Sequence, residues 1–486
     1  MLFNSPIFAL FLPVVFFLYW FACQRNLKLQ NLFIVVASYV FYGWWSWKFL
    51  LLISFTTVCS YVCGLLMRRF ETSHASRKFL HIANIVLNLG ILGVFKYYNF
   101  FIENFISAFA SMGITLQPHT LNLILPVGIS FYTFQALSYT IDVYQRKIEP
   151  TKDVLAFFAY ISFFPLLVAG PIERATNLLP QFYVKRVFDY GMAVDGMRQI
   201  LWGLFKKIVV ADTCAIYVNA IFADVHVYSG GALLLGAIFF AFQIYGDFSG
   251  YSDIALGVAR LFGIRAMRNF AYPYFSRDIA EFWRRWHISL TTWFRDYVYI
   301  PLGGSRVSRG KVIRNTFIIF LVSGFWHGAN WTFLAWGALH ALLFVPLILL
   351  GKNRKNLDTV ATGRLLPTFG DFFKMCATFA LVDIGWVFFR ARSIGQAFEY
   401  LARIGVANGD AYFSMPPTLQ ILAARCLFFI ACVLFVEWVG RAHQFGLEKL
   451  GLAWHRAFRY LVYVVIAITI LLHVEARPSE FIYFQF

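Results

Sequence analysis

Two histidines in apolar segments are the residues best suited to chemistry in this 486-residue sequence. His327 lies in SGFWHGANW, among small, aromatic and amide side chains, and His287 lies 40 residues earlier in WRRWHISL. An ionisable side chain at membrane depth is costly, so it usually faces a cavity or a polar partner. A neutral imidazole in a cavity can take the proton of a hydroxyl nucleophile, as acyl transfer requires. The structural alternative is a histidine that only hydrogen-bonds two helices together.

Basic and aromatic residues around His287 could bind an acyl donor. Three arginines lie close to it in the sequence: Arg284, Arg285 and Arg295. Guanidinium groups pair with phosphate oxygens, either of a nucleotide-bearing cofactor or of lipid headgroups. We expect Trp286 and Asn330 to belong to the same binding site. Asn330, His287 or backbone amides are candidate donors to the oxyanion of an acyl-transfer intermediate.

The last six residues, FIYFQF (481–486), contain four aromatic side chains, and Tyr483 carries the one hydroxyl among them. An aromatic tail in water promotes aggregation, so we expect the protein to bury it. The tail could serve only for packing, or it could present Tyr483 to a pocket.

Two acids, Asp247 and Asp253, lie in the glycine-containing stretch QIYGDFSGYSDIALG. We expect the region Gly246–Gly250 to interrupt a helix here, as Gly170-Pro171 interrupts an earlier apolar run. Broken helices leave backbone amides without partners, and we expect the two acids to satisfy them. Orienting a histidine or binding a cation are the alternatives.

Apolar runs along the whole chain must position these groups. Hydrophobic residues make up 60% of the sequence and charged residues only 14%, whereas a soluble domain carries about a quarter charged residues. Continuous runs predict an all-α polytopic membrane protein and exclude a transmembrane β-barrel, whose strands alternate. The expected spans are residues 6–22, 30–46, 49–66, 80–97, 120–138, 154–170, 199–219, 230–247, 313–329, 331–350, 371–389, 417–437 and 458–474.

Residues 280–306 should form an amphipathic helix that lies in the membrane interface or caps the core. Its apolar face consists of Phe282, Trp286, Leu290, Trp293 and Tyr297. The arginines fall largely off this face. Pro301 and Gly303-Gly304 then let the chain turn back toward His327.

Basic residues set the predicted orientation. The first apolar run, Ile7–Cys23, lacks a basic start and a cleavage site, so we interpret it as a retained span. Basic residues follow it and also precede the last span, which places both termini on the extracytoplasmic side. The net charge of +18 then reflects cytoplasmic loops and anionic lipids rather than nucleic acid. The seven cysteines show neither metal-ligand spacing nor a disulfide framework, and we expect core packing for all of them.

Three motifs resemble the membrane-bound O-acyltransferase superfamily: WRRWHISLTTWFRDYVYIPLGG, SGFWHGANWTFLAWG and ASYVFYGWW. The resemblance covers essentially the whole chain, and DFSGYSD and the order of segments agree with it. It is closest to the bacterial branch that acetylates envelope glycans, which includes alginate and peptidoglycan O-acetyltransferases. It implies a helical core with a central tunnel, His327 as the catalytic residue and His287 as a second residue of the tunnel.

The resemblance also bears on the tail. In the related teichoic-acid D-alanylation system, a small single-span protein ends in a similar tail whose tyrosine is implicated as an acyl acceptor. By analogy, Tyr483 would be an acyl relay fused to the last span. The implied organisation is one integral-membrane domain, 1–486, with a catalytic core over 115–400 and a final span with its tail over 455–486.

The implied function is O-acetylation of an extracytoplasmic polysaccharide from a bacterial inner membrane. Acetyl-CoA would be the acyl donor, a periplasmic SGNH or esterase-type protein the partner, and no metal or prosthetic group is expected. Three alternatives stay open: direct transfer to the glycan with the tail as a plug, a transporter or flippase with broken helices, and a lipid or protein acyltransferase of the same superfamily. The sequence does not specify the glycan.

Overall fold

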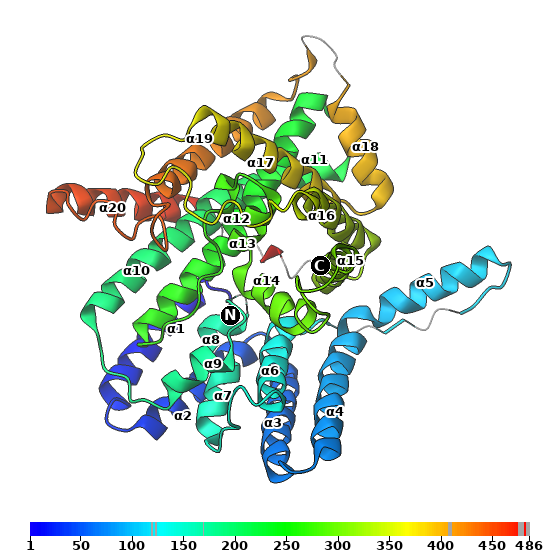
Figure 1. The fold of residues 1–486 in the computed structure, drawn as a ribbon. Helices are drawn as coiled ribbons and strands as arrows, with labels where there is room; N and C mark the ends of the chain where they lie inside the picture. The colour runs from blue at the N-terminus through cyan, green and yellow to red at the C-terminus, as the bar shows by residue number, and fades with distance from the viewer. Residues whose placement is uncertain (118–119, 122–123, 169, 407–410, 475–480, 483–486) are drawn as a thin grey trace. The chain divides into compact units, whose positions relative to one another are not determined.

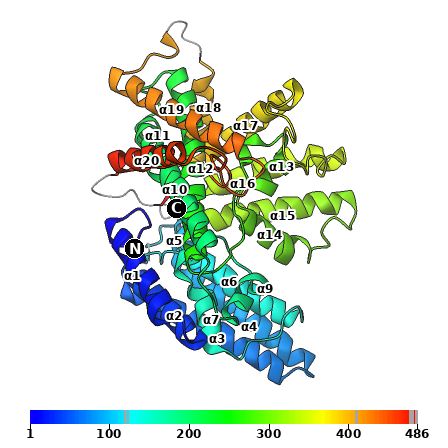
Figure 2. The ribbon, with the colours of Figure 1, turned by 90° about the vertical axis from the view of Figure 1, so that its left-hand side faces the viewer.

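The computed structural model describes residues 1–486 except 118–119, 122–123, 169, 407–410, 475–480 and 483–486. In the described part of the chain every regular element is a helix (Figures 1 and 2). Within these described residues, seven helices are long and apolar enough to cross a membrane, and two shorter apolar helices, Pro6–Ala22 and Leu27–Gly43, accompany them. The predicted all-α polytopic fold is therefore confirmed.

The chain divides into two compact units. The N-terminal unit comprises Met1–Ala193 and Ala259–Met267, and the C-terminal unit comprises Val194–Val258 and Arg268–Phe486. The expected catalytic core, 115–400, takes residues from both units, and its extent stays a prediction.

Helices of the N-terminal unit follow the apolar runs. They are α1 (Pro6–Phe17), η1 (Leu18–Ala22), α2 (Leu27–Gly43), α3 (Trp47–Arg69), α4 (His74–Leu92), η2 (Gly93–Tyr97), α5 (Tyr98–Ser111), α6 (Ile129–Tyr144), α7 (Val154–Ser162), α8 (Phe164–Leu167), α9 (Ala175–Leu178) and η3 (Leu179–Phe182). Helices α3, α4 and α6 pack side by side (Figure 1). The expected span 154–170 is divided into α7 and α8 at Phe163, whereas the break was expected at Gly170-Pro171. The expected start of the span 120–138 is wrong, because α6 begins only at Ile129.

The C-terminal unit contains the remaining helices, and α10 and α12 have residues in both units. They are α10 (Tyr190–Leu204), η4 (Phe205–Ala211), α11 (Asp212–Ala223), α12 (Gly230–Leu261), η5 (Pro273–Phe275), α13 (Ile279–Arg285), α14 (Ile288–Phe294), η6 (Arg295–Tyr299), α15 (Arg309–His327), α16 (Trp331–Leu349), α17 (Phe369–Arg390), α18 (Ile394–Ile404), α19 (Pro417–Val439) and α20 (Arg456–His473). Helix α16 packs between α15 and α17 (Figure 2).

The predicted break at Gly246–Gly250 is wrong, because α12 runs without interruption for 32 residues. A Cβ atom on Gly246 would lie 2.9 Å from the carbonyl oxygen of Lys206, and one on Gly250 would lie 2.8 Å from that of Gly203. These glycines therefore allow two helical backbones to approach closely, which is a common use of small residues in membrane proteins.

The predicted single helix over 280–306 is also wrong. It is divided into α13, α14 and η6, with a break at His287, whose backbone is left-handed (φ 42°, ψ 54°). Four members of the expected apolar face are buried: Phe282, Trp286, Leu290 and Trp293. The stretch thus packs into the C-terminal unit through these buried side chains.

Cysteine packing follows the prediction for four of the seven residues, Cys23, Cys63, Cys214 and Cys426, which are buried. Cys376 is exposed on α17, so the prediction of core packing is wrong for it. All seven cysteines are free.

Candidate functional site

A cavity of about 500 Å³ lies in the C-terminal unit. Its wall is built by α13, α14, η6, α15, α16 and the loop that follows α16. Both His287 and His327 belong to this wall, together with apolar residues such as Phe320 and Phe344. The fold therefore brings the two histidines of the sequence analysis to one cavity.

His327 is the last residue of α15. Gly328 continues in extended backbone, and Asn330 then caps α16 by accepting a 3.0 Å hydrogen bond from the amide of Thr332. The imidazole is 3% exposed, and three aromatic rings surround it edge-on at centroid distances of 5.0–5.3 Å: Trp326, Trp336 and Phe389. These rings restrict the orientation of the imidazole while leaving it part of the cavity wall.

His287 lies between α13 and α14 and is 1% exposed. Its Nδ1 atom is 3.2 Å from the side-chain oxygen of Asn269. The same oxygen accepts hydrogen bonds from the amide of Ser289 at 3.3 Å and from its hydroxyl at 2.9 Å. Burial lowers the pKa of His287 to about 3, so its imidazole is neutral at physiological pH.

The hydrogen bonds of Asn269 determine the tautomer of His287. A backbone N–H only donates, so the Asn269 atom that accepts from Ser289 must be oxygen. Nδ1 of His287 therefore donates to this oxygen, and Nε2 of the neutral ring is the acceptor. The left-handed backbone of His287 costs free energy, and strained residues of this kind cluster at functional sites.

The predicted donor-binding residues are only partly brought together. Arg284 and Arg295 line the cavity. The side chain of Arg284 also donates to the carbonyl oxygens of Asn353 at 2.9 Å and Asn356 at 2.6 Å, and so holds the loop after α16. Trp286 lies instead in an aromatic cluster, with its ring stacked on Phe282.

Asn330 is likewise engaged elsewhere. Its side-chain oxygen caps α16, and its side-chain nitrogen points toward the carbonyl oxygen of Arg392 at 3.4 Å. It does not line the cavity that contains the histidines.

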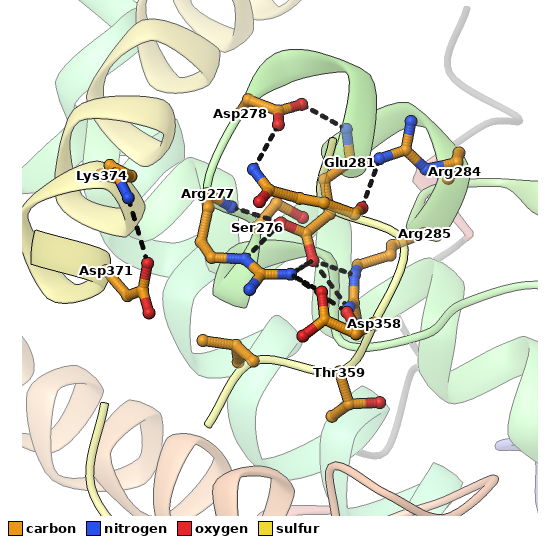
Figure 3. Close-up of polar contacts among 12 residues, drawn as sticks. Ser276, Arg277, Asp278, Glu281, Arg284, Arg285, Asp358, Thr359, Asp371 and Lys374 are labelled. Carbon is orange, nitrogen blue, oxygen red and sulfur yellow. Dashed lines mark hydrogen bonds and ion pairs between the residues drawn. The ribbon is translucent and has the colours of Figure 1, made fainter. Parts of the chain in front are cut away.

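Arg285 belongs to a network of ion pairs, shown in Figure 3. Its guanidinium donates to Glu281 at 2.8 Å and to the carbonyl oxygens of Ala271 and Asp358. Arg277 pairs with Glu281 at 3.1 Å and with Asp358 at 2.9 Å (Figure 3). Glu281 is 1% exposed and serves both arginines. Arg285 thus connects α13 to the segment around Asp358 and does not line the cavity.

The sequence matches the family model of the membrane-bound O-acyltransferases over residues 39–381. This chain is a membrane-bound O-acyltransferase. It is 36% identical to a probable alginate O-acetylase of Pseudomonas putida, with 100% of both chains covered. It is 35% identical to a peptidoglycan O-acetyltransferase of Helicobacter pylori over 84% of this chain and 80% of the relative. A teichoic acid D-alanyltransferase of Streptococcus thermophilus is 30% identical over 50% of this chain and 62% of the relative. Family membership excludes the transporter interpretation.

Sequence reasoning missed two residues of the candidate site. Asn269, which orients His287, lies in a loop without any motif. Arg354 lines the cavity from the loop after α16 and is exposed there. The run Lys352–Lys355, with three basic residues in four, was the available signal for the second of them.

The two acids of α12 pair with lysines rather than with amides of a broken helix. Lys206 lies 2.7 Å from Asp253, and Lys207 lies 2.7 Å from Asp247. All four side chains are buried or nearly so. The predicted satisfaction of broken-helix amides is wrong, because the helix is intact and offers no unpaired amides there.

The aromatic tail is buried where the structure describes it, as predicted. Phe481 and Ile482 are 0% and 2% exposed, and the amide of Ile482 donates a 2.6 Å hydrogen bond to Asp247. Figure 1 draws this short segment in red, close to the C label. Tyr483 lies outside the described residues.

Proposed function

We propose that this O-acyltransferase moves acetyl groups from cytoplasmic acetyl-CoA across the membrane for O-acetylation of an extracytoplasmic cell-envelope polysaccharide. Relatives that cover most of the chain are named as alginate and peptidoglycan O-acetyltransferases, which supports a polysaccharide acceptor. The observation that carries the proposal is the cavity whose wall contains both histidines and three arginines. Such a wall combines a proton acceptor with cations for a phosphate-bearing donor.

In the first transfer His327 acts as the general base. The phenol of Tyr483, with an unperturbed pKa of about 10, is a weak nucleophile at neutral pH and needs such a base. Its oxygen attacks the thioester carbonyl carbon while His327 takes the phenolic proton. The carbon–sulfur bond then breaks, the imidazolium returns the proton to the departing thiolate, and the products are CoA and acetyl-tyrosine.

His287 suits a role as hydrogen-bond acceptor better than one as oxyanion donor. Because Nδ1 donates to Asn269, Nε2 of the neutral ring has no proton to give. It can accept a hydrogen bond from a hydroxyl group in the cavity. The oxyanion donors are then backbone amides, since Asn330 is engaged in capping α16.

Arg284, Arg295 and Arg354 are the residues that would hold the phosphates of acetyl-CoA. All three line the histidine cavity, whereas Arg285 is neutralised by Glu281. Arg354 is exposed, so its guanidinium can meet a ligand without first breaking a buried contact.

In the second transfer a sugar hydroxyl attacks the acetyl-tyrosine carbonyl and the phenol leaves, which regenerates Tyr483. An extracytoplasmic SGNH or esterase-type partner would catalyse this step. The proposal places the enzyme in the inner membrane of a bacterial cell, among its lipids, with both termini on the extracytoplasmic side.

The test is transfer by the purified full-length enzyme from acetyl-CoA labelled in the acetyl group. We expect release of CoA and addition of one acetyl group to the C-terminal peptide, measured by mass spectrometry. His327→Ala should abolish both signals, and Tyr483→Phe should abolish the adduct. Full acetylation of the native glycan by the Tyr483→Phe enzyme would refute the relay. Full acetylation by His327→Ala would refute the role of this histidine.

A further inference from the structure

The tail is attached to the middle of α12 through Asp247. The two carboxylate oxygens of Asp247 have different partners: Oδ1 lies 2.7 Å from Nζ of Lys207, and Oδ2 accepts the amide of Ile482 at 2.6 Å. Lys207 in turn lies 2.9 Å from Asp212. One carboxylate thus takes part in both the salt bridge and the hydrogen bond, and a carboxylate makes a stronger hydrogen bond to an amide than a neutral acceptor does.

Aromatic contacts fix the same tail segment from the side. The ring of Phe481 packs on Phe248 and Tyr251 of α12, with centroids 5.5 and 4.7 Å apart. Phe248 also packs edge-on against His287 at 4.6 Å. One ring therefore separates the anchored tail from a histidine of the cavity.

We infer that Asp247 is a positioning residue that anchors the C-terminal tail for acyl transfer, an inference that rests on the proposed relay through Tyr483. The anchored amide belongs to the residue directly before Tyr483, so the bond fixes the chain at the point where the relay begins. The ion pair with Lys207 holds the carboxylate in place, and Phe481 packs the same segment against α12. The segment DFSGY (247–251) therefore binds residues 481–482.

The first experiment measures the anchor without using activity. Full-length enzyme in detergent is digested with a carboxypeptidase, and mass spectrometry follows trimming past Ile482. We expect wild-type enzyme to resist and Asp247→Ala to be trimmed at least about tenfold faster, the effect of losing one charge-assisted hydrogen bond. Asp253→Ala is the matched control, because it removes a buried acid of the same helix that also pairs with a lysine at 2.7 Å. Equal trimming rates in the two variants would overturn the anchor.

The second experiment asks whether the anchor serves transfer. Asp247→Ala should lower kcat for glycan acetylation while KM for acetyl-CoA stays within about twofold. Asp247→Asn keeps an acceptor oxygen and should recover part of kcat. A raised KM with unchanged kcat would overturn the positioning role.

Two further variants keep these outcomes interpretable. If Asp247→Ala does not fold, Phe481→Ala loosens the tail without touching the buried ions, and it should show the same rapid trimming and low kcat. Tyr483→Phe tests the relay itself: full activity there refutes the proposed function even when the trimming results support the anchor.

Discussion

Nδ1 of His287 lies 3.2 Å from the side-chain oxygen of Asn269, and this contact determines which nitrogen of the buried imidazole carries the proton. Asn269 is itself buried and also bonds the hydroxyl of Ser252 at 3.3 Å. A residue outside every recognisable motif thus sets the chemistry that His287 presents to the cavity.

Replacing Asn269 should therefore impair turnover. Asn269→Leu removes the acceptor for Nδ1–H, so we expect kcat to fall by about 10–100-fold, the range known for residues that orient metal-bound imidazoles. KM for acetyl-CoA should stay nearly unchanged. Ser289→Ala is the control, since it removes one donor to the same oxygen and a longer 3.5 Å contact to Nδ1, but leaves the 3.2 Å contact between His287 and Asn269 intact. Steady-state kinetics in which both variants are equally impaired would contradict the assignment.

The pH dependence of stability should reveal the buried imidazole. The pKa of His287 is lowered by burial from 6.5 to about 3, so between these values the unfolded chain binds more protons than the folded one. The contribution of this residue to the free energy of unfolding is fully present above pH 6.5. It is lost as pH falls, by about 2 kcal/mol between pH 7 and 5. Apparent melting temperatures in detergent should fall less over this range for His287→Gln than for wild-type enzyme. Parallel curves would be evidence against a neutral buried imidazole.

Glu281 should be more important for stability than its neighbour Asp358. Glu281→Ala leaves Arg277 and Arg285 without their shared buried carboxylate (Figure 3), and loss of one member of a buried pair costs about 3–5 kcal/mol. Asp358 is exposed, so Asp358→Ala should cost less than about 1 kcal/mol. Thermal unfolding in detergent compares them directly. Equal decreases in melting temperature for the two variants would mean that the exposed Asp358 contributes as much to stability as the buried Glu281.

Arg354 should contribute to binding of the acyl donor. Removal of a charge-assisted contact costs about 1.5–3 kcal/mol, so Arg354→Gln should raise KM for acetyl-CoA about tenfold or more at unchanged kcat. Lys355→Gln provides the control, because this neighbouring cation does not line the cavity. The added salt that weakens exposed ion pairs should reduce the difference between wild type and Arg354→Gln. A KM equal to that of Lys355→Gln would exclude Arg354 from the donor site.

The helical fold could be predicted from the sequence because hydrocarbon forces each spanning segment to satisfy its own backbone. The role of Gly246 and Gly250 could not. A glycine that breaks a helix and a glycine that admits a neighbouring backbone look alike in one sequence, and only the position of Lys206 opposite Gly246 distinguishes them.

The residues of the candidate site could be predicted from their types, but their ion-pair and hydrogen-bond partners could not. His287 and His327 stood out as ionisable residues among apolar ones, and the cavity contains both. The pairing of Lys206 and Lys207 with acids some forty residues further along has no local signal. The ion pair between Arg285 and Glu281 could not be predicted either. The two residues are one helical turn apart, but the same spacing also occurs on solvated helix faces.

The hydrogen bond between Ile482 and Asp247 joins residues 235 positions apart, and this separation has a consequence for biogenesis. At the ribosome, α12 is synthesised and inserted long before residue 481 exists. The nascent chain therefore carries the Lys207–Asp247 pair while residues 248–480 are still being synthesised, and both histidines from residue 327 onward, without the segment that docks there. Docking of residues 481–482 on α12 is consequently a late event of assembly, which follows the synthesis of both histidines.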